Sequence, residues 1–99
     1  MEVLQSMVEQ NPADSFSRYG LAMELVNAGR LDDAEQQFVT LLEHNPNYVA
    51  AYFHGGQTLE KLRRKDDARA LYRRGIEAAS AAGDDHTAAE LQGALDQLG

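Results

Sequence analysis

Apolar residues recur along this chain with helical spacing, in six segments that are separated by short polar stretches. In one of them Ala34, Phe38, Leu41 and Leu42 share a face, because positions three and four apart lie on the same side of a helix. The pattern predicts helices over residues 2–10, 15–28, 33–44, 48–62, 66–80 and 85–98. No strand is predicted, so we expect an all-α fold.

Capping and turn residues mark the ends of these segments. Gly29 follows the second segment, where a helix commonly ends in the left-handed conformation. Asp32 is a candidate N-cap, with Glu35 placed to complete a capping box, and Asp66 is the candidate N-cap of a later helix. Asn45-Pro46 is predicted to end a helix, because the residue before proline is disfavoured in the α region.

The chain repeats itself at an interval of 34 residues. That shift brings Asn11-Pro12 onto Asn45-Pro46, the Asp-Asp-Ala run at 32–34 onto the same run at 66–68, and Phe38 onto Tyr72. Each period is therefore predicted to be a pair of helices that buries its apolar face by stacking on the next pair.

These residues resemble the tetratricopeptide repeat family, whose 34-residue pattern fixes large, small and aromatic positions and a closing proline. The first unit carries the pattern as Arg18, Leu21, Ala22, Leu25, Ala34, Phe38 and Pro46, and the second as Tyr52, Gly55, Gly56, Leu59, Ala68, Tyr72 and Ser80. Arg18, Gly55 and Ser80 depart from it. The resemblance implies one domain over residues 1–99, a right-handed α-α superhelix of stacked antiparallel hairpins. Its parts would be a truncated helix over 1–11, repeats over 15–46 and 47–80, and a capping helix over 84–99.

The segment 15–28 carries two apolar stripes, although packing on a partner helix needs only one. Leu21, Leu25 and Ala28 form the first stripe, and Phe16, Tyr19, Met23 and Val26 form the second. The resemblance implies that this helix lines a concave surface, to which the second unit adds Ala50, Phe53, Gln57 and Glu60. The second stripe either binds a partner or covers the helix over 2–10, and we expect Tyr19 and Phe53 to stay accessible.

Some members of the family bind C-terminal carboxylates through lysines and asparagines on this concave surface. The corresponding places here hold Tyr19, Met23 and His54, so the resemblance does not extend to that ligand.

Charge is unevenly distributed along a chain whose net charge is −7 and whose pI is about 4.7, a balance that disfavours nucleic acid and anionic membranes. Seven bases nevertheless fall within residues 61–74. They are Lys61, Arg63, Arg64, Lys65, Arg69, Arg73 and Arg74. This basic segment is either a solvated outer face, partly neutralised by Asp66 and Asp67, or a docking patch for an acidic partner or for the acidic ends of a second copy. RNA is a less favoured partner for this segment.

The sequence contains few residues that could form a catalytic or metal-binding site. There is no cysteine, and the spacing of His44, His54 and His86 fits no metal motif, so we interpret them as solvated or capping residues. Asp84-Asp85 is interpreted as an N-cap. Neither a phosphate-binding loop nor a nucleophile elbow is present, so we expect no enzyme, no cofactor and no metal. The N-terminus lacks a signal peptide and no segment approaches a membrane span, so a cytoplasmic location without membrane contact is expected.

Together these features predict a non-catalytic protein-interaction module or scaffold that binds a protein or peptide segment on its concave face. The residues predicted to bind it are Phe16, Tyr19, Met23, Phe53, Gln57, Arg69 and Arg73. The alternative is a self-assembling structural protein, a weak homo-oligomer. An enzyme or an RNA binder is less favoured.

Overall fold

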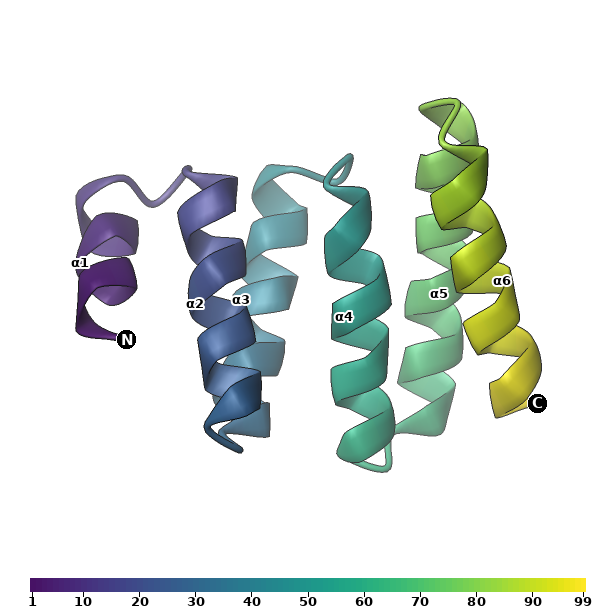
Figure 1. The fold of residues 1–99 in the computed structure, drawn as a ribbon, viewed down its shortest axis with the longest axis horizontal. Coiled ribbons are helices and arrows are strands. Elements are labelled where there is room, and N and C mark those ends of the chain that lie inside the picture. The colour runs from purple at the N-terminus through teal and green to yellow at the C-terminus, as the bar shows by residue number, and fades with distance from the viewer.

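The computed structural model describes all 99 residues and contains six helices and no strand. The helices are α1 (Glu2–Gln10), α2 (Ser15–Asn27), α3 (Leu31–His44), α4 (Val49–Lys61), α5 (Lys65–Ala81) and α6 (Asp85–Leu98). They stand side by side in a row that begins with α1 and ends with α6 (Figure 1). In this view α2, α4 and α6 are in front, and α3 and α5 lie behind them. The predicted all-α stack of antiparallel hairpins is confirmed.

Packing between helices follows the repeat. The pairs α2–α3 and α4–α5 are hairpins, α3 also packs against α4, and α5 packs against α6. Contacts between α2 and α4, and between α4 and α6, join the front helices into one inner layer. The first helix, α1, packs against α2 alone, as α3 packs against α4. It therefore occupies the place of the second helix of a pair.

The repeat-equivalent aromatics Phe38 and Tyr72 fill the core, and both are almost completely buried. Each lies against one of the two adjacent glycines of α4. A Cβ atom on Gly55 would lie 3.4 Å from the Cβ of Phe38, and one on Gly56 would lie 2.2 Å from a ring carbon of Tyr72. The ring of Tyr72 thus occupies the space that any larger residue at position 56 would need, which is why glycine interrupts a helix interior here.

The structure corrects the predicted starts of α3 and α5. Asp32 and Asp66 are not N-caps, because the helices begin one residue earlier, at Leu31 and Lys65, and the capping positions are Arg30 and Arg64. Neither arginine side chain caps a backbone N–H. The aspartates lie within the first turn instead, where a carboxylate interacts favourably with the positive end of the helix dipole.

The reason for these early starts is the turn that precedes each helix. The backbone N–H of Arg30 donates to the carbonyl of Leu25, and that of Arg64 donates to the carbonyl of Leu59, both at 2.9 Å. These bonds close a Schellman turn and leave the next residue already helical. The predicted capping box is also wrong, because the carboxylate of Glu35 faces the Arg64 guanidinium at 3.5 Å. The N-cap predicted at Asp84 is confirmed, since its carboxylate accepts from the Thr87 N–H at 3.1 Å.

Candidate protein-binding surface

A row of aromatic rings crosses the inner layer from α2 to α4. The ring of Tyr19 on α2 lies 5.3 Å from that of Tyr48 and 5.8 Å from the His54 imidazole, measured between centroids. His54 in turn meets the edge of Phe53 at 5.4 Å. Tyr19 and Phe53 occupy the same repeat position, so the fold brings together two residues that the sequence predicted to be accessible, and both are half-buried.

Burial favours the uncharged forms in this aromatic row. It raises the pKa of Tyr19 and that of Tyr48, whose phenols are neutral at pH 7 in any case. Burial also lowers the pKa of the His54 imidazole, and the opposing attraction of the Glu90 carboxylate is smaller. His54 is therefore a neutral ring at pH 7, neither solvated nor capping, which corrects the interpretation made from the sequence.

Next to this row, α4 and α6 enclose an open groove of about 560 Å³. Its lining residues are Phe53, Gln57, Glu60, Lys61, Tyr72, Glu90, Gly93, Ala94 and Gln97. Two of them, Phe53 and Gln57, are predicted binding residues. At one end the Tyr72 hydroxyl donates to the Glu60 carboxylate. Burial, together with that hydrogen bond, holds the pKa of Tyr72 well above its usual value.

The other residues of the second apolar stripe have different surroundings. Phe16 is 74% exposed, so α1 does not cover it, whereas Met23 is half-buried against the core. Leu4 of α1 packs on α2, and its methyl groups lie 3.3 Å from the position of a Cβ on Gly20. The structure therefore does not support the alternative in which the whole stripe serves to cover the helix over 2–10.

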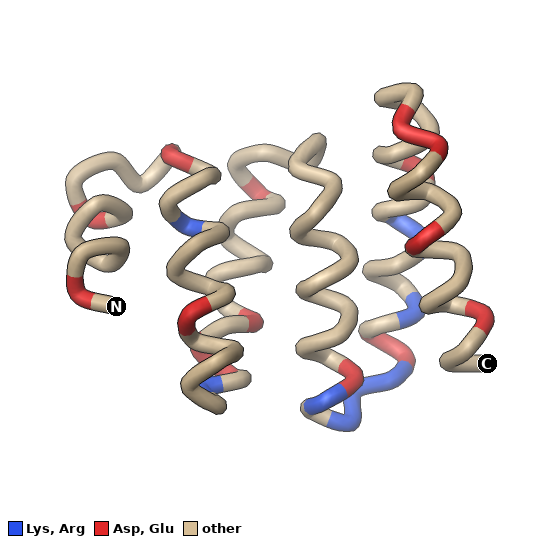
Figure 2. The backbone as a smooth tube through the Cα atoms, in the orientation of Figure 1, with Lys and Arg blue, Asp and Glu red and all other residues tan.

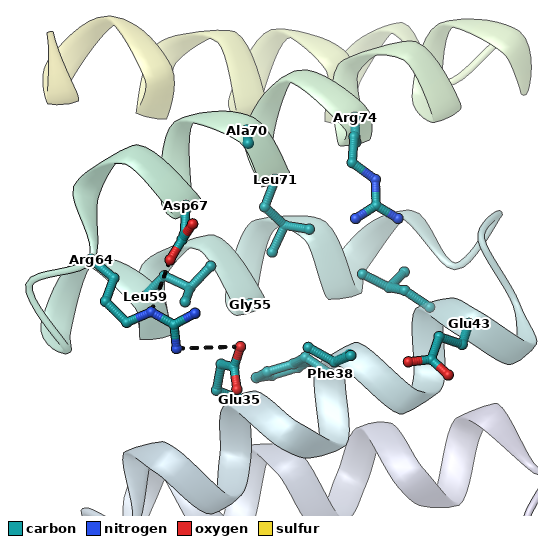
Figure 3. A pocket seen from close by; sticks show the side chains of 12 residues that line it. Glu35, Phe38, Glu43, Gly55, Leu59, Arg64, Asp67, Ala70, Leu71 and Arg74 are labelled. Atoms are coloured by element: carbon teal, nitrogen blue, oxygen red, sulfur yellow. Dashed lines mark hydrogen bonds and ion pairs between the residues drawn. The ribbon is translucent and has the colours of Figure 1, made fainter.

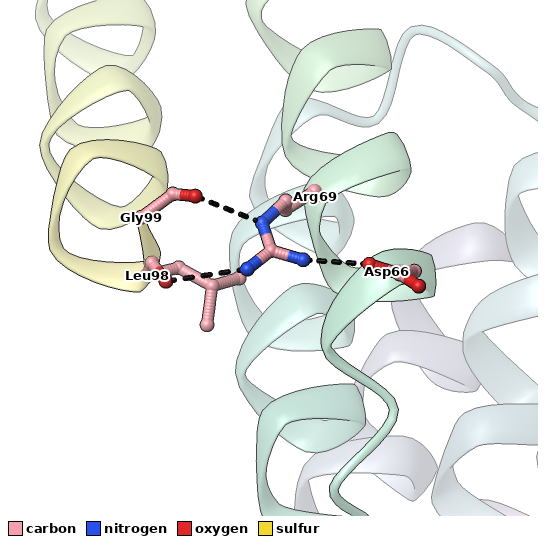
Figure 4. Close-up of polar contacts among 4 residues, drawn as sticks. All are labelled: Asp66, Arg69, Leu98 and Gly99. Atoms are coloured by element: carbon pink, nitrogen blue, oxygen red, sulfur yellow. Dashed lines mark hydrogen bonds and ion pairs between the residues drawn. The ribbon is translucent and has the colours of Figure 1, made fainter.

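The basic segment lies around the turn between α4 and α5 and along α5 (Figure 2). Arg69 is used within the chain: its Nη1 pairs with Asp66 at 2.6 Å, and its Nε donates to the Gly99 carbonyl at 3.1 Å (Figure 4). It thereby holds the last turn of α6, where a cation is favourable. Arg64 is likewise paired with Asp67. Arg73 is exposed, and no side-chain hydrogen bond or ion pair engages it.

A second hollow, of about 400 Å³, lies between α3 and α5, with Gly55 and Leu59 of α4 also in its lining (Figure 3). Phe38, Val39, Leu42 and Leu71 give it an apolar floor, and the Arg64–Glu35 pair closes one end. Sequence reasoning missed this hollow. Its only signal is Val39, an exposed apolar residue on a face of α3 that is otherwise polar.

Groups suited to metal chemistry do not gather in the structure, since no three His, Asp or Glu side chains converge on one point. His44 is exposed, with its Nδ1 2.9 Å from the Thr40 carbonyl, and His86 is exposed beside Glu90. No helix is both long enough and apolar enough to cross a membrane.

The family is shown by comparison with known proteins. A model of the tetratricopeptide repeat matches residues 19–85, and the chain therefore belongs to the tetratricopeptide repeat family. Domains of this family are generally non-catalytic interaction modules. No curated protein matches the chain.

Solved structures agree with this assignment. A tetratricopeptide repeat domain protein from Salinibacter ruber is 39% identical, with 89% of each chain covered and a TM-score of 0.84. PcrH, in complex with the chaperone binding region of PopD, is 18% identical; the match covers 98% of this chain and 74% of that one, with a TM-score of 0.91. The TPR2B domain of yeast Sti1, in a complex with pHsp70, is 15% identical, with 98% and 78% covered and a TM-score of 0.91. The last two similarities show the fold alone.

Proposed function

We propose that this protein is an interaction module whose inner layer binds a segment of another protein. The observation that carries the proposal is the groove between α4 and α6, which continues the aromatic row from α2. Half-buried aromatic rings beside an open groove offer large apolar contact area at low entropic cost, as interface centres do. The complexes of PcrH with a region of PopD and of the TPR2B domain with pHsp70 support this use of the fold.

The predicted residues take different parts in this proposal. Phe53 and Tyr19 are the apolar anchors, and the exposed amide of Gln57, one turn beyond Phe53, hydrogen-bonds the backbone of the bound segment. Met23 supports the floor, and Phe16 contacts the segment where it leaves the groove. Arg73 steers approach from the rim. Arg69 is left out of the contact because its guanidinium already holds the end of α6.

Selection of binders from a library of random 12-residue peptides tests the proposal without a known partner. Peptides selected on the wild-type protein are expected to bind Phe53→Ala and Tyr19→Ala at least about tenfold more weakly, mainly through faster dissociation. Gln57→Arg obstructs the groove from an exposed position and is expected to weaken binding without unfolding the domain.

The matched control is Val39→Ala, which truncates an exposed aliphatic residue in the hollow between α3 and α5. It is expected to leave binding unchanged. Peptides that bind Gln57→Arg like the wild type but lose affinity for Val39→Ala would place recognition on the opposite face and refute the proposal.

Self-association is the second candidate, and one observation favours it. The face of α1 that carries Val3 and Met7 corresponds to the face of α3 that α2 covers, yet these residues are 73% and 42% exposed. A second copy would bury this apolar face. Arg64 and Arg69 already have acidic partners within the chain, so they are not free to pair with the acidic ends of a second copy. The contact between two copies would therefore be apolar and insensitive to salt. Sedimentation velocity at rising protein concentration, with Val3→Asp as the disrupting variant, decides it.

A further inference from the structure

The charged residues of the groove between α4 and α6 are divided between its two ends. Glu60 and Lys61 are neighbours at the C-terminal end of α4, where they compensate each other and where Glu60 also accepts from the Tyr72 hydroxyl. Glu90 is the only charged residue that α6 contributes to the groove. At 1.5 Å per residue, Phe53 lies about 12 Å along the helix axis from Lys61, beyond a Debye length at physiological salt. The end that contains Phe53 is therefore acidic, although the basic segment begins at the other end.

Aromatic rings accompany the Glu90 carboxylate at this end. Phe53 and Glu90 line the same groove, and the charge of Glu90 acts on the His54 imidazole, which meets the edge of Phe53. His54 is neutral at pH 7, so it neither repels a cation nor neutralises Glu90. The ion-pair partner of Glu90 is His86, at 3.1 Å on the same helix, which is 87% exposed and does not line the groove.

We propose that this end of the groove binds an arginine side chain of the partner segment. The guanidinium stacks on the Phe53 ring and donates two parallel hydrogen bonds to the Glu90 carboxylate, while the Gln57 side-chain oxygen accepts a further N–H. A planar cation fits because both an aromatic face and a carboxylate are present. A carboxylate of the partner at this place would instead be repelled by the Glu90 carboxylate. The inference rests on the proposed function and adds to it the chemistry of the partner: a basic segment, although the band at 61–74 alone suggested an acidic one.

The test uses the random peptide library and adds two protein variants. Arginine is expected to be enriched at one position among peptides selected on the wild type, and that enrichment is expected to disappear on Glu90→Gln. Glu77→Gln, which removes an exposed carboxylate from α5, is the matched control and should preserve the enrichment.

One selected peptide then isolates the contact. Replacing its arginine by citrulline, which has nearly the same shape and no charge, is expected to weaken binding to the wild type by about three- to thirtyfold, the combined range of a surface cation–π contact and an exposed ion pair. Against Glu90→Gln the same replacement should cost only about two- to fivefold, because the carboxylate partner is gone and only the cation–π contact with Phe53 is lost.

The outcomes separate this inference from the function on which it rests. Peptides that lose affinity for Phe53→Ala but show no arginine enrichment, or whose citrulline loss is equal on Glu90→Gln, would overturn the arginine site and leave the interaction module intact. A library that yields no binders at all, or only binders indifferent to Phe53→Ala and Gln57→Arg, would overturn both.

Discussion

Arg18 and Tyr52 are different residues, 34 positions apart, that donate to the same carbonyl of their respective repeats. The Arg18 Nη2 donates to the Pro12 carbonyl at 3.0 Å, and the Tyr52 hydroxyl donates to the Pro46 carbonyl at 2.7 Å. Both side chains are buried. Arginine therefore replaces the aromatic residue of the family pattern without loss of the tie that fixes each inner helix to the loop before it.

This relationship predicts the effect of Tyr52→Phe. The variant keeps the ring but leaves the Pro46 carbonyl without its donor, which should lower the free energy of unfolding by about 1–2 kcal/mol. Tyr48→Phe is the control, because no hydrogen bond of the Tyr48 hydroxyl is present and that ring is only half-buried. Urea denaturation followed by circular dichroism measures both. Equal stability of the two variants would show that the tie to Pro46 contributes nothing.

A second prediction concerns Arg63, which is the only residue other than glycine with a positive φ, at 62°. Gly29 holds the same place in the first repeat, at 77°. The left-handed conformation costs a residue with a Cβ about 1–2 kcal/mol, and glycine avoids that cost. Glycine also makes the unfolded chain more flexible, which offsets about 0.4–1 kcal/mol of the gain in stability. Arg63→Gly should therefore stabilise the domain by about 0.5–1 kcal/mol in urea denaturation. The reciprocal variant, Gly29→Arg, should destabilise it by a similar amount; a stabilising Gly29→Arg would contradict the turn geometry.

A third prediction compares two glycines inside helices. Gly56→Ala would place a methyl group 2.2 Å from the Tyr72 ring, so overpacking should destabilise the domain by about 1–3 kcal/mol. Gly93→Ala meets nothing within 4 Å, so the higher helix propensity of alanine should stabilise the domain by up to about 1 kcal/mol. Thermal unfolding of both variants checks the difference in sign. A stable Gly56→Ala protein would mean that Tyr72 does not occupy the space beside α4.

The sequence was sufficient for the elements and the core. Helical spacing predicted six helices, and the 34-residue repeat placed Phe38 and Tyr72 at one position, because both depend on which residues share one helix face. The N-cap of α3 was predicted wrongly at Asp32, whereas the capping position is Arg30. A helix start depends on where the preceding turn closes, and the bond from Arg30 to Leu25 that closes it leaves no periodic trace in the sequence.

The candidate site was only partly predictable. Tyr19 and Phe53 stood out because they are apolar beyond what the hairpins need. Glu90 did not, because its importance comes from α6 lying against α4, and no repeat position relates the two walls of the groove. The role of Arg69 was hidden for a similar reason: its guanidinium reaches a carbonyl 30 residues away, at the end of a helix outside the repeat.

The last prediction concerns acid and the N-cap of α6. Hydrogen bonds from Thr87 hold the pKa of the Asp84 carboxyl below its usual value, because they favour the ionised form. A depressed folded-state pKa gives stability that is present above the unfolded-state pKa of about 3.9 and is lost as the pH falls through the folded-state value.

Asp84→Asn keeps an oxygen that accepts from the Thr87 N–H but removes the charge. The variant should therefore be less stable than the wild type at pH 7. The difference should shrink only below about pH 4, and urea midpoints measured from pH 7 down to the lowest pH at which the helical signal persists follow it. A difference that stays constant to that limit, or that grows below pH 4, would show that the charge of Asp84 does not stabilise the start of α6.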